Sequence, residues 1–400
     1  MPVCRKCNRY LLKESPSGYC RICERDIAQE NEKQKRREEE EMKRRAAEEK
    51  NEASREFAAI VGNIKAALTG DKEKDIPFLE EQMEKYKGHK MGRDIILECA
   101  RMKTLYLPKK SAAEMERIKQ VLNEKKPYEL VLEDVRRKML EKKYNEALVP
   151  MEKLIHAINA MGVIKENPLG EYHCFNEVFE ELLYALNANP ARELRPALMP
   201  YDKIYALYGS LLIDLNRPDD AEAALAEAMT WNPSDADIAS EHAETFRIKG
   251  DMDAFFRNNL KIFRIAFRPK QLARCYRRLG YYFIEKELWE EAVGCYFLSL
   301  QFDKESMQAR SELNYITQKA GKVIPRPDRQ TMEKIARNYG FPFGPDENVL
   351  GLAAYLGEKA AEKGAYNRAK YFFQIYYDLI PDPSVKKKLD EMNRRLQFGG

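Results

Sequence analysis

Glycine and proline are scarce in this chain, which contains 19 of each among its 400 residues. Together they make up about a tenth of the sequence, below the roughly 12% that is usual in proteins. Valine (12 residues) and threonine (6 residues), which extended strands favour, are also few. These shortages exclude a collagen-like protein and an all-β sandwich, and they favour a mainly α fold.

Long apolar runs are missing as well. No uninterrupted stretch reaches the about 18 apolar residues of a membrane-spanning helix, and the first 50 residues are strongly polar. A signal peptide is therefore not expected. Several of the eight cysteines stand alone in helix-like segments, which fits a reducing compartment. We expect a cytoplasmic protein without a membrane partner.

The motifs of common active sites are absent from the sequence. It contains no phosphate-binding glycine-rich loop, no HExxH zinc motif and no nucleophile elbow. Acidic pairs are abundant, but they lie in charge runs where solvated helix faces are the default. We therefore expect a binding protein and no enzyme.

Four of the cysteines form a motif near the N-terminus, with the spacing C-x2-C-x12-C-x2-C at Cys4, Cys7, Cys20 and Cys23. Each C-x2-C turn presents two thiolates, and two such turns complete a tetrahedral site for Zn²⁺. The segment resembles a zinc ribbon, which implies a small β-hairpin with structural zinc. A unit of about 25 residues cannot hold a core unaided, so the metal would supply its folding energy. A redox dithiol is the alternative, but it requires a βαβ context that the sequence lacks.

A charge-rich segment follows the cysteines. Residues 24–56 contain 12 acidic and 10 basic residues and no proline or glycine. Acid–base pairs four residues apart support a helix, and the absence of apolar residues between Ala28 and Met42 excludes a coiled-coil seam there. We predict a solvated helical spacer, with a frayed or disordered linker as the alternative. From Phe57 the pattern becomes amphipathic, which predicts further helices.

The remainder of the chain is repetitive. The 34-residue windows 202–235, 273–306 and 350–383 share small or apolar residues at the same offsets. Position 8 is glycine (Gly209, Gly280, Gly357), position 20 is alanine (Ala221, Ala292, Ala369), and position 24 is large (Leu225, Tyr296, Phe373). Small residues allow two antiparallel helices to approach closely, and the large residues fill the space between them.

These windows resemble the tetratricopeptide repeat (TPR) family. The resemblance implies an α-solenoid of antiparallel helix pairs, here preceded by the zinc ribbon and the long charged helix. Weaker copies lie at 128–161, with Val135 in place of the glycine, and at 236–269, where Ala254 indicates a turn shortened by one residue. The expected domains are a zinc ribbon (1–25), a charged helical spacer (26–56), a helical region (57–127), divergent TPR-like helices with an insertion (128–199), TPR repeats (200–320), an irregular insertion with a short helix (321–349), and a C-terminal TPR with a capping helix (350–400).

One segment of the repeats is strongly basic. Residues 254–284 carry eight Lys or Arg residues and no acid, in a chain whose net charge is only +4. The spacing of its first four basic residues predicts one helix face (Arg257, Lys261, Arg264, Arg268), and the aromatic residues beside them are expected in the core. The TPR resemblance implies a groove lined by the first helix of each repeat. Residues expected there are Arg274, Arg277, Arg278 and Tyr281, with Lys203 and Arg247 from preceding repeats.

These observations predict a protein–protein interaction scaffold whose groove binds a partner protein or peptide, with an acidic peptide as the favoured ligand of the basic patch. Bidentate contacts between arginine and carboxylate provide the physical basis. The alternative is a nucleic-acid-associated protein that uses the zinc ribbon together with the patch at 257–278. The basic segment could also be a solvated face, or pair with the acidic residues of 24–56.

Overall fold

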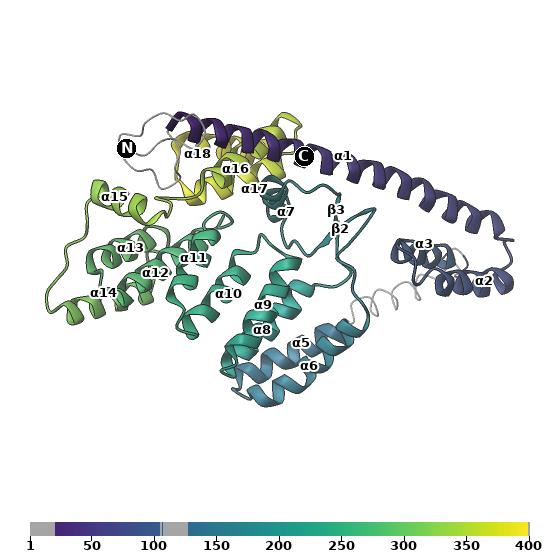
Figure 1. The fold of residues 1–400 in the computed structure, drawn as a ribbon, viewed down its shortest axis with the longest axis horizontal. Helices are drawn as coiled ribbons and strands as arrows, with labels where there is room; N and C mark the ends of the chain where they lie inside the picture. The colour runs from purple at the N-terminus through teal and green to yellow at the C-terminus, as the bar shows by residue number, and fades with distance from the viewer. Residues whose placement is uncertain (1–20, 105, 107–126, 399–400) are drawn as a thin grey trace. The chain divides into compact units, whose positions relative to one another are not determined.

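The computed structural model of the chain describes residues 21–104, 106 and 127–398. It divides into two compact units, each described separately below (Figure 1). Most of the described residues are helical, so the prediction of a mainly α fold is confirmed. Among them, no helix is both long enough and apolar enough to cross a membrane.

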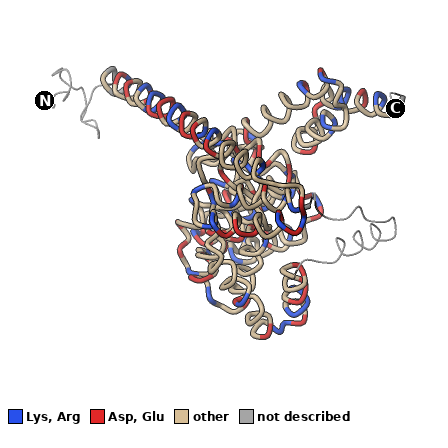
Figure 2. Tube along the Cα trace, turned by 90° about the vertical axis from the view of Figure 1, so that its right-hand side faces the viewer, with Lys and Arg blue, Asp and Glu red and all other residues tan. Residues whose placement is uncertain are grey.

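The first unit is built on one long helix, α1 (Arg21–Ala67), with α2 (Lys72–Lys85) and α3 (Gly92–Thr104). Acidic and basic residues alternate along α1 (Figure 2), and Glu32–Arg36 and Glu41–Arg45 form ion pairs four residues apart. The helix predicted for the charged spacer is therefore present. It continues without a break past residue 57, where the sequence predicted a separate region. Apolar residues from its C-terminal part pack with α2 and α3: Ala53, Val61, Ile64, Leu79, Ile95 and Cys99.

Two short segments from the expected insertion at 162–200, residues 166–171 and 190–195, belong to this first unit. They contribute to a three-stranded sheet of β1 (Glu166–Asn167), β2 (Gly170–His173) and β3 (Leu194–Pro196), in that order. Arg192 forms ion pairs with Glu49 of α1 and with Glu166. Part of the insertion thus packs in the first unit, with residues of α1 that precede it by more than 100 positions.

The second unit contains the remaining described helices. They are α5 (Pro127–Leu140), α6 (Tyr144–Ala160), α7 (Val178–Ala188), α8 (Tyr201–Asp214), α9 (Pro218–Trp231), α10 (Ala236–Ile248), α11 (Met252–Ile262), α12 (Pro269–Glu285), α13 (Trp289–Phe302), α14 (Met307–Ala320), α15 (Arg329–Tyr339), α16 (Glu347–Glu362), α17 (Tyr366–Leu379) and α18 (Pro383–Phe398). Neighbouring helices from α8 to α14 pack against one another in chain order (Figure 1).

Five helix pairs of this unit share one turn. In each pair, position 15 of the 34-residue window has a positive φ: Lys142, Asn216, Gly250, Glu287 and Gly364. In each, the N–H of position 16 donates to the carbonyl of position 11, over 2.8–2.9 Å. This is the hydrogen bond that closes a helix with a left-handed residue at its end. The two weaker copies have this turn at the same offsets as the other three pairs. All five pairs are therefore repeats of one helix-pair motif.

The close approach predicted at position 8 is present. A Cβ atom on Gly209 would lie 2.5 Å from Leu225, and one on Gly280 would lie 2.6 Å from the Tyr296 ring. Each contact joins position 8 of a first helix to position 24 of its second helix. The predicted pairing of a glycine with a large residue therefore determines the helix separation.

Two details of the predicted repeats are wrong. The turn of the copy at 236–269 is not shortened, because Gly250 and the N–H of Asp251 occupy the same offsets as in the other pairs. The basic face drawn through Arg257 and Arg268 is not one helix, because α11 ends at Ile262 and α12 begins at Pro269.

The fifth pair does not continue the stack. α16 makes no extensive contact with α14. Instead, residues of α16 and α17 share a core with α7, α12 and α13; the rings of Phe372 and Phe179 lie 6.2 Å apart. Tyr276 of α12 donates to the carbonyl of Pro342 over 2.9 Å, within the segment that leads back to this core.

A buried acidic cluster lies near the start of α8. Asp202 is 1% exposed, and Asn176 donates to its Oδ2 over 3.2 Å. Its Oδ1 has no hydrogen-bond partner among the described residues. Burial raises the pKa of Asp202, and it also raises the pKa of Glu180 and of Asp235.

Candidate binding cleft

The first helices of two successive repeats, α10 and α12, line a cleft of about 400 Å³ together with the next helix in this order, α14. The cleft residues are Glu241, Glu244 and Arg247 from α10, Phe255 from α11, Arg274, Arg277, Arg278 and Tyr281 from α12, Tyr296 from α13, and Gln308 and Glu312 from α14. Five of the ten residues predicted to bind a partner therefore meet in one place. They come from the groove positions that the TPR resemblance implied.

The amphipathic pattern of α12 explains why its arginines reach the cleft. Arg274, Arg278 and Tyr281 recur at intervals of three and four residues, which places them along one side of the helix. Leu272, Leu279 and Phe283 are fully buried in the core. Packing of the apolar side thus directs the basic side toward α10 and α14.

The arginines of the cleft are paired with carboxylates of the same chain. Arg274 bonds Glu241 over 2.6 Å, and Arg247 bonds Glu244 over 2.6 Å. Arg277 bonds Asp303, at the end of α13, over 3.2 Å. A count of charges within residues 254–284 does not include these carboxylates, because all three lie outside that segment. The cleft is a surface of mixed charge rather than a purely basic one.

Arg278 is the most deeply buried arginine of the cleft, and its charge is incompletely bonded. The residue is 7% exposed. Its Nη2 donates to the carbonyl of Ser240, and the Glu244 carboxylate lies 3.9 Å away, but Nη1 has no hydrogen-bond partner among the described residues. Burial, and secondly the neighbouring charge of Arg274, lower the pKa of Arg278 to about 10. A buried charged donor without a partner is costly, so an acceptor from a ligand would be favoured here.

Glu312 is the acidic counterpart on α14. It is partly buried, and burial raises the pKa of its carboxyl group. No cation of the described chain lies within ion-pair distance of it. Glu312 was not among the predicted groove residues, because no repeat window begins at 307 in the sequence prediction. The offsets of the other windows place Gln308 and Glu312 at groove positions 2 and 6.

The other predicted partner-binding residues lie outside the cleft. Arg257 and Lys203 are exposed on α11 and α8. Lys261 and Arg264 border a separate cavity of about 820 Å³. Arg268 forms an ion pair with Glu177, which also accepts a hydrogen bond from Tyr371 over 2.6 Å. Arg268 thus supports the packing of α7 and α17.

The predicted zinc ligands fall at the edge of the described residues. Cys4, Cys7 and Cys20 lie outside them, and Cys23 is buried in the first turn of α1. Within the part of the chain that the structure describes, no group of three or more His, Cys, Asp or Glu side chains is placed to hold a metal ion. The zinc ribbon stays a prediction.

No protein-family model and no curated protein matches the chain. Among solved structures, one described as the functional characterisation of Pseudomonas aeruginosa PilF is 12% identical, with a TM-score of 0.33, over 66% of this chain and 96% of that chain. The crystal structure of the APC/C Cut9–Hcn1 hetero-tetramer is 15% identical, with a TM-score of 0.29, over 86% of this chain and 67% of that chain. The function is therefore argued from the helix packing and the cleft.

Proposed function

We propose that this protein is a protein-interaction scaffold, and that the cleft of α10, α12 and α14 receives an acidic segment of a partner protein. The incompletely bonded Arg278 is the observation that carries the proposal. The Arg278 side chain lines the cleft between α10, α12 and α14, and its buried Nη1 has no hydrogen-bond partner among the described residues. A carboxylate of the partner would complete its bonding, and such charge-assisted bonds are about twice as strong as neutral ones.

The mixed charge of the cleft also favours a polypeptide over a simple anion. A peptide segment carries hydrogen-bond acceptors, which Arg278 can bond, and also N–H donors, from which Glu312 and Gln308 can accept. Tyr281, which is partly exposed, adds aromatic surface to the same walls. Large amphipathic side chains of this kind contribute strongly to protein interfaces.

Affinity capture from the native cell, followed by mass spectrometry, tests the proposal. The cleft variant carries Arg274→Gln and Arg278→Gln, which remove charge without burying a new carboxylate. The matched control carries Arg257→Gln and Arg264→Gln, which make the same charge change at exposed positions outside the cleft. We expect the cleft variant to lose partners that the wild type and the control retain. Equal retention by both variants, with unchanged circular dichroism, would contradict the proposal.

A nucleic-acid-associated function is the alternative. It would use the basic residues of the first 25 positions together with the patch at 257–278. Because much of that patch is already paired with carboxylates, a nucleic acid would have to displace them. Several phosphate contacts predict an affinity that falls steeply with salt, so failure to retain random DNA or RNA at low salt would exclude this alternative.

A further inference from the structure

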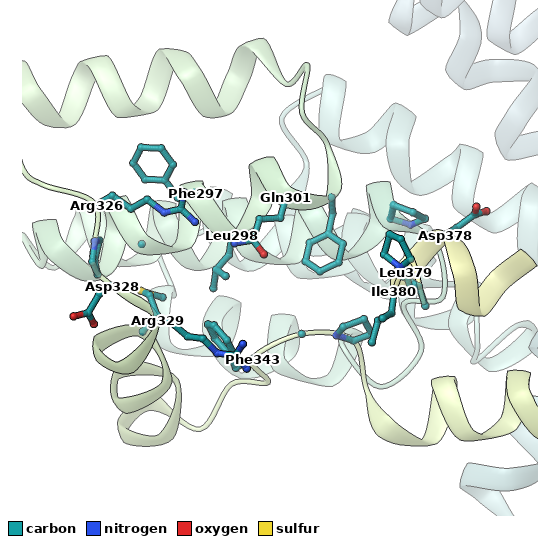
Figure 3. Close-up of a pocket in the computed structure, with 18 residues that line it drawn as sticks. Phe297, Leu298, Gln301, Arg326, Asp328, Arg329, Phe343, Asp378, Leu379 and Ile380 are labelled. Carbon is teal, nitrogen blue, oxygen red and sulfur yellow. The ribbon is translucent and has the colours of Figure 1, made fainter. Parts of the chain in front are cut away.

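A further cavity, of about 1030 Å³, lies beside α13 (Figure 3). Its walls come from α13, from the segment that leads into α15, from residues 343–345 and from the end of α17. α15 packs directly on α13 within this lining, where a Cβ on Gly294 would collide with the Met332 side chain. We propose that this cavity binds a small organic carboxylate with an apolar body, a site separate from the proposed protein-binding cleft.

The walls are largely apolar and held in place. Phe297, Phe302 and Phe343 supply aromatic surface, and Phe343 is 37% exposed. Four prolines also line the cavity, and the ring of each fixes φ: Pro269, Pro327, Pro345 and Pro381. A cavity whose walls cannot relax inward loses little order when a ligand enters, which favours binding.

One charged group of this cavity is available for a ligand. Arg326 lies alongside Phe297, with its guanidinium 5.1 Å from the ring centroid (Figure 3), and no carboxylate of the described chain lies within ion-pair distance of it. The other charges have partners. Arg329 pairs with Glu333 over 2.8 Å, and Asp328 accepts the N–H of Thr331 over 2.7 Å at the start of α15. Asp378, the remaining charged residue of the lining, accepts a hydrogen bond from Gln374 over 2.6 Å. Arg326 is therefore the lining charge that has no ion-pair or hydrogen-bond partner among the described residues, and the matching ligand is an anion.

The walls favour a small molecule over a peptide strand. Recognition of an extended peptide relies on backbone N–H donors, but prolines have none. The N–H of Gly344 is already used, because it donates to Tyr276 over 2.7 Å. An apolar cavity of this size with one or few polar groups is typical of small-molecule sites. Its ligand would place an aromatic or aliphatic body between the phenylalanines and a carboxylate on Arg326.

Fluorescence titration of the full chain with 1-pyrenebutyrate tests this site, with the neutral 1-pyrenebutanol as the matched probe. The Arg326→Gln variant removes the charge, and Gln301→Trp fills the cavity from its exposed wall on α13. Arg257→Gln is the control, because this exposed arginine lies outside the cavity. We expect one bound carboxylate per chain, bound about tenfold more tightly than the alcohol, which is the usual strength of a charge-assisted bond.

The variants give distinct expected results. Arg326→Gln should abolish the preference for the carboxylate, Gln301→Trp should weaken both probes by about tenfold or more, and the control should match the wild type. Equal binding of the two probes to the wild type, or carboxylate binding unaffected by Arg326→Gln, would overturn the proposal. Displacement of the probe by the blocked peptide Ac-Ala-Ala-Phe at lower concentration than by 1-naphthylacetate would overturn it in favour of a peptide terminus.

Discussion

The contact between Gly280 and Tyr296 makes a quantitative prediction about the repeats. In Gly280→Ala, the new Cβ would lie 2.6–2.8 Å from three atoms of the Tyr296 ring. Carbon atoms in favourable contact lie about 3.5–4.0 Å apart. Tyr296 is only 1% exposed, so its ring cannot swing into solvent. The two helices of the pair must therefore separate, or the ring must leave its preferred rotamer.

Two opposing effects determine the size of the change. Overpacking of a core costs about 1–3 kcal/mol, whereas replacing glycine by alanine inside a helix gains up to about 1 kcal/mol. We expect a net loss of about 1–2 kcal/mol in the free energy of unfolding. Gly351→Ala in α16 is the matched control, because nothing lies within 4 Å of its Cβ position. The difference between the two variants cancels the helix-propensity gain and isolates the packing cost.

Urea unfolding followed by tryptophan fluorescence is the suitable assay. The only tryptophans of the chain, Trp231 and Trp289, both lie in the second unit, so their signal reports on the repeats. We expect Gly351→Ala to raise the unfolding midpoint and Gly280→Ala to lower it. If both variants raised it equally, position 8 would not determine the helix separation, and the packing argument for the repeats would be refuted.

Three further predictions concern single features. Glu287 has a left-handed backbone that costs residues with a Cβ, so Glu287→Gly should raise the free energy of unfolding by about 0.5–1 kcal/mol in the same assay; a decrease would contradict the shared turn. Burial raises the pKa of Asp202, so the protonated carboxyl group contributes favourably to the free energy of unfolding. This contribution is lost as the pH rises through the pKa of the folded state. Asp202→Asn should therefore flatten the loss of stability between about pH 4 and neutral pH, and an unchanged pH profile would exclude this role. Metal analysis of the purified protein should find about one zinc per chain, lost on replacing Cys4 and Cys7 by serine; a zinc-free wild type would exclude the ribbon.

The repeat offsets were predictable from the sequence because each reflects a local steric requirement. Where the two helices of a pair touch, a large side chain at position 24 leaves room only for glycine at position 8. The left-handed turn residue was harder to detect, since only two of the five are glycine and two are Lys142 and Glu287. Its shared place at position 15 is recognised from the structure, because the same hydrogen bond closes all five turns.

Longer-range features were not predictable in this way. The departure of α16 and α17 from the stack depends on how Met332 packs against Gly294 and on Phe179 meeting Phe372. These pairs are separated by 38 and 193 positions. No periodic pattern relates such distant residues, so the insertions could be located in the sequence but their packing could not.

The candidate cleft combines both kinds of information. The repeat positions predicted that Arg274, Arg277 and Arg278 line one groove, and all three line the cleft. The charge of residues 254–284 predicted a basic patch without acidic partners, and that part of the prediction was wrong. Glu241, one repeat earlier, pairs with Arg274, and Asp303 at the end of α13 pairs with Arg277. An acidic partner would therefore exchange one carboxylate for another at most of these arginines and gain little there. The net gain is concentrated at the buried Nη1 of Arg278, so recognition depends on the placement of one acceptor more than on the partner's total charge.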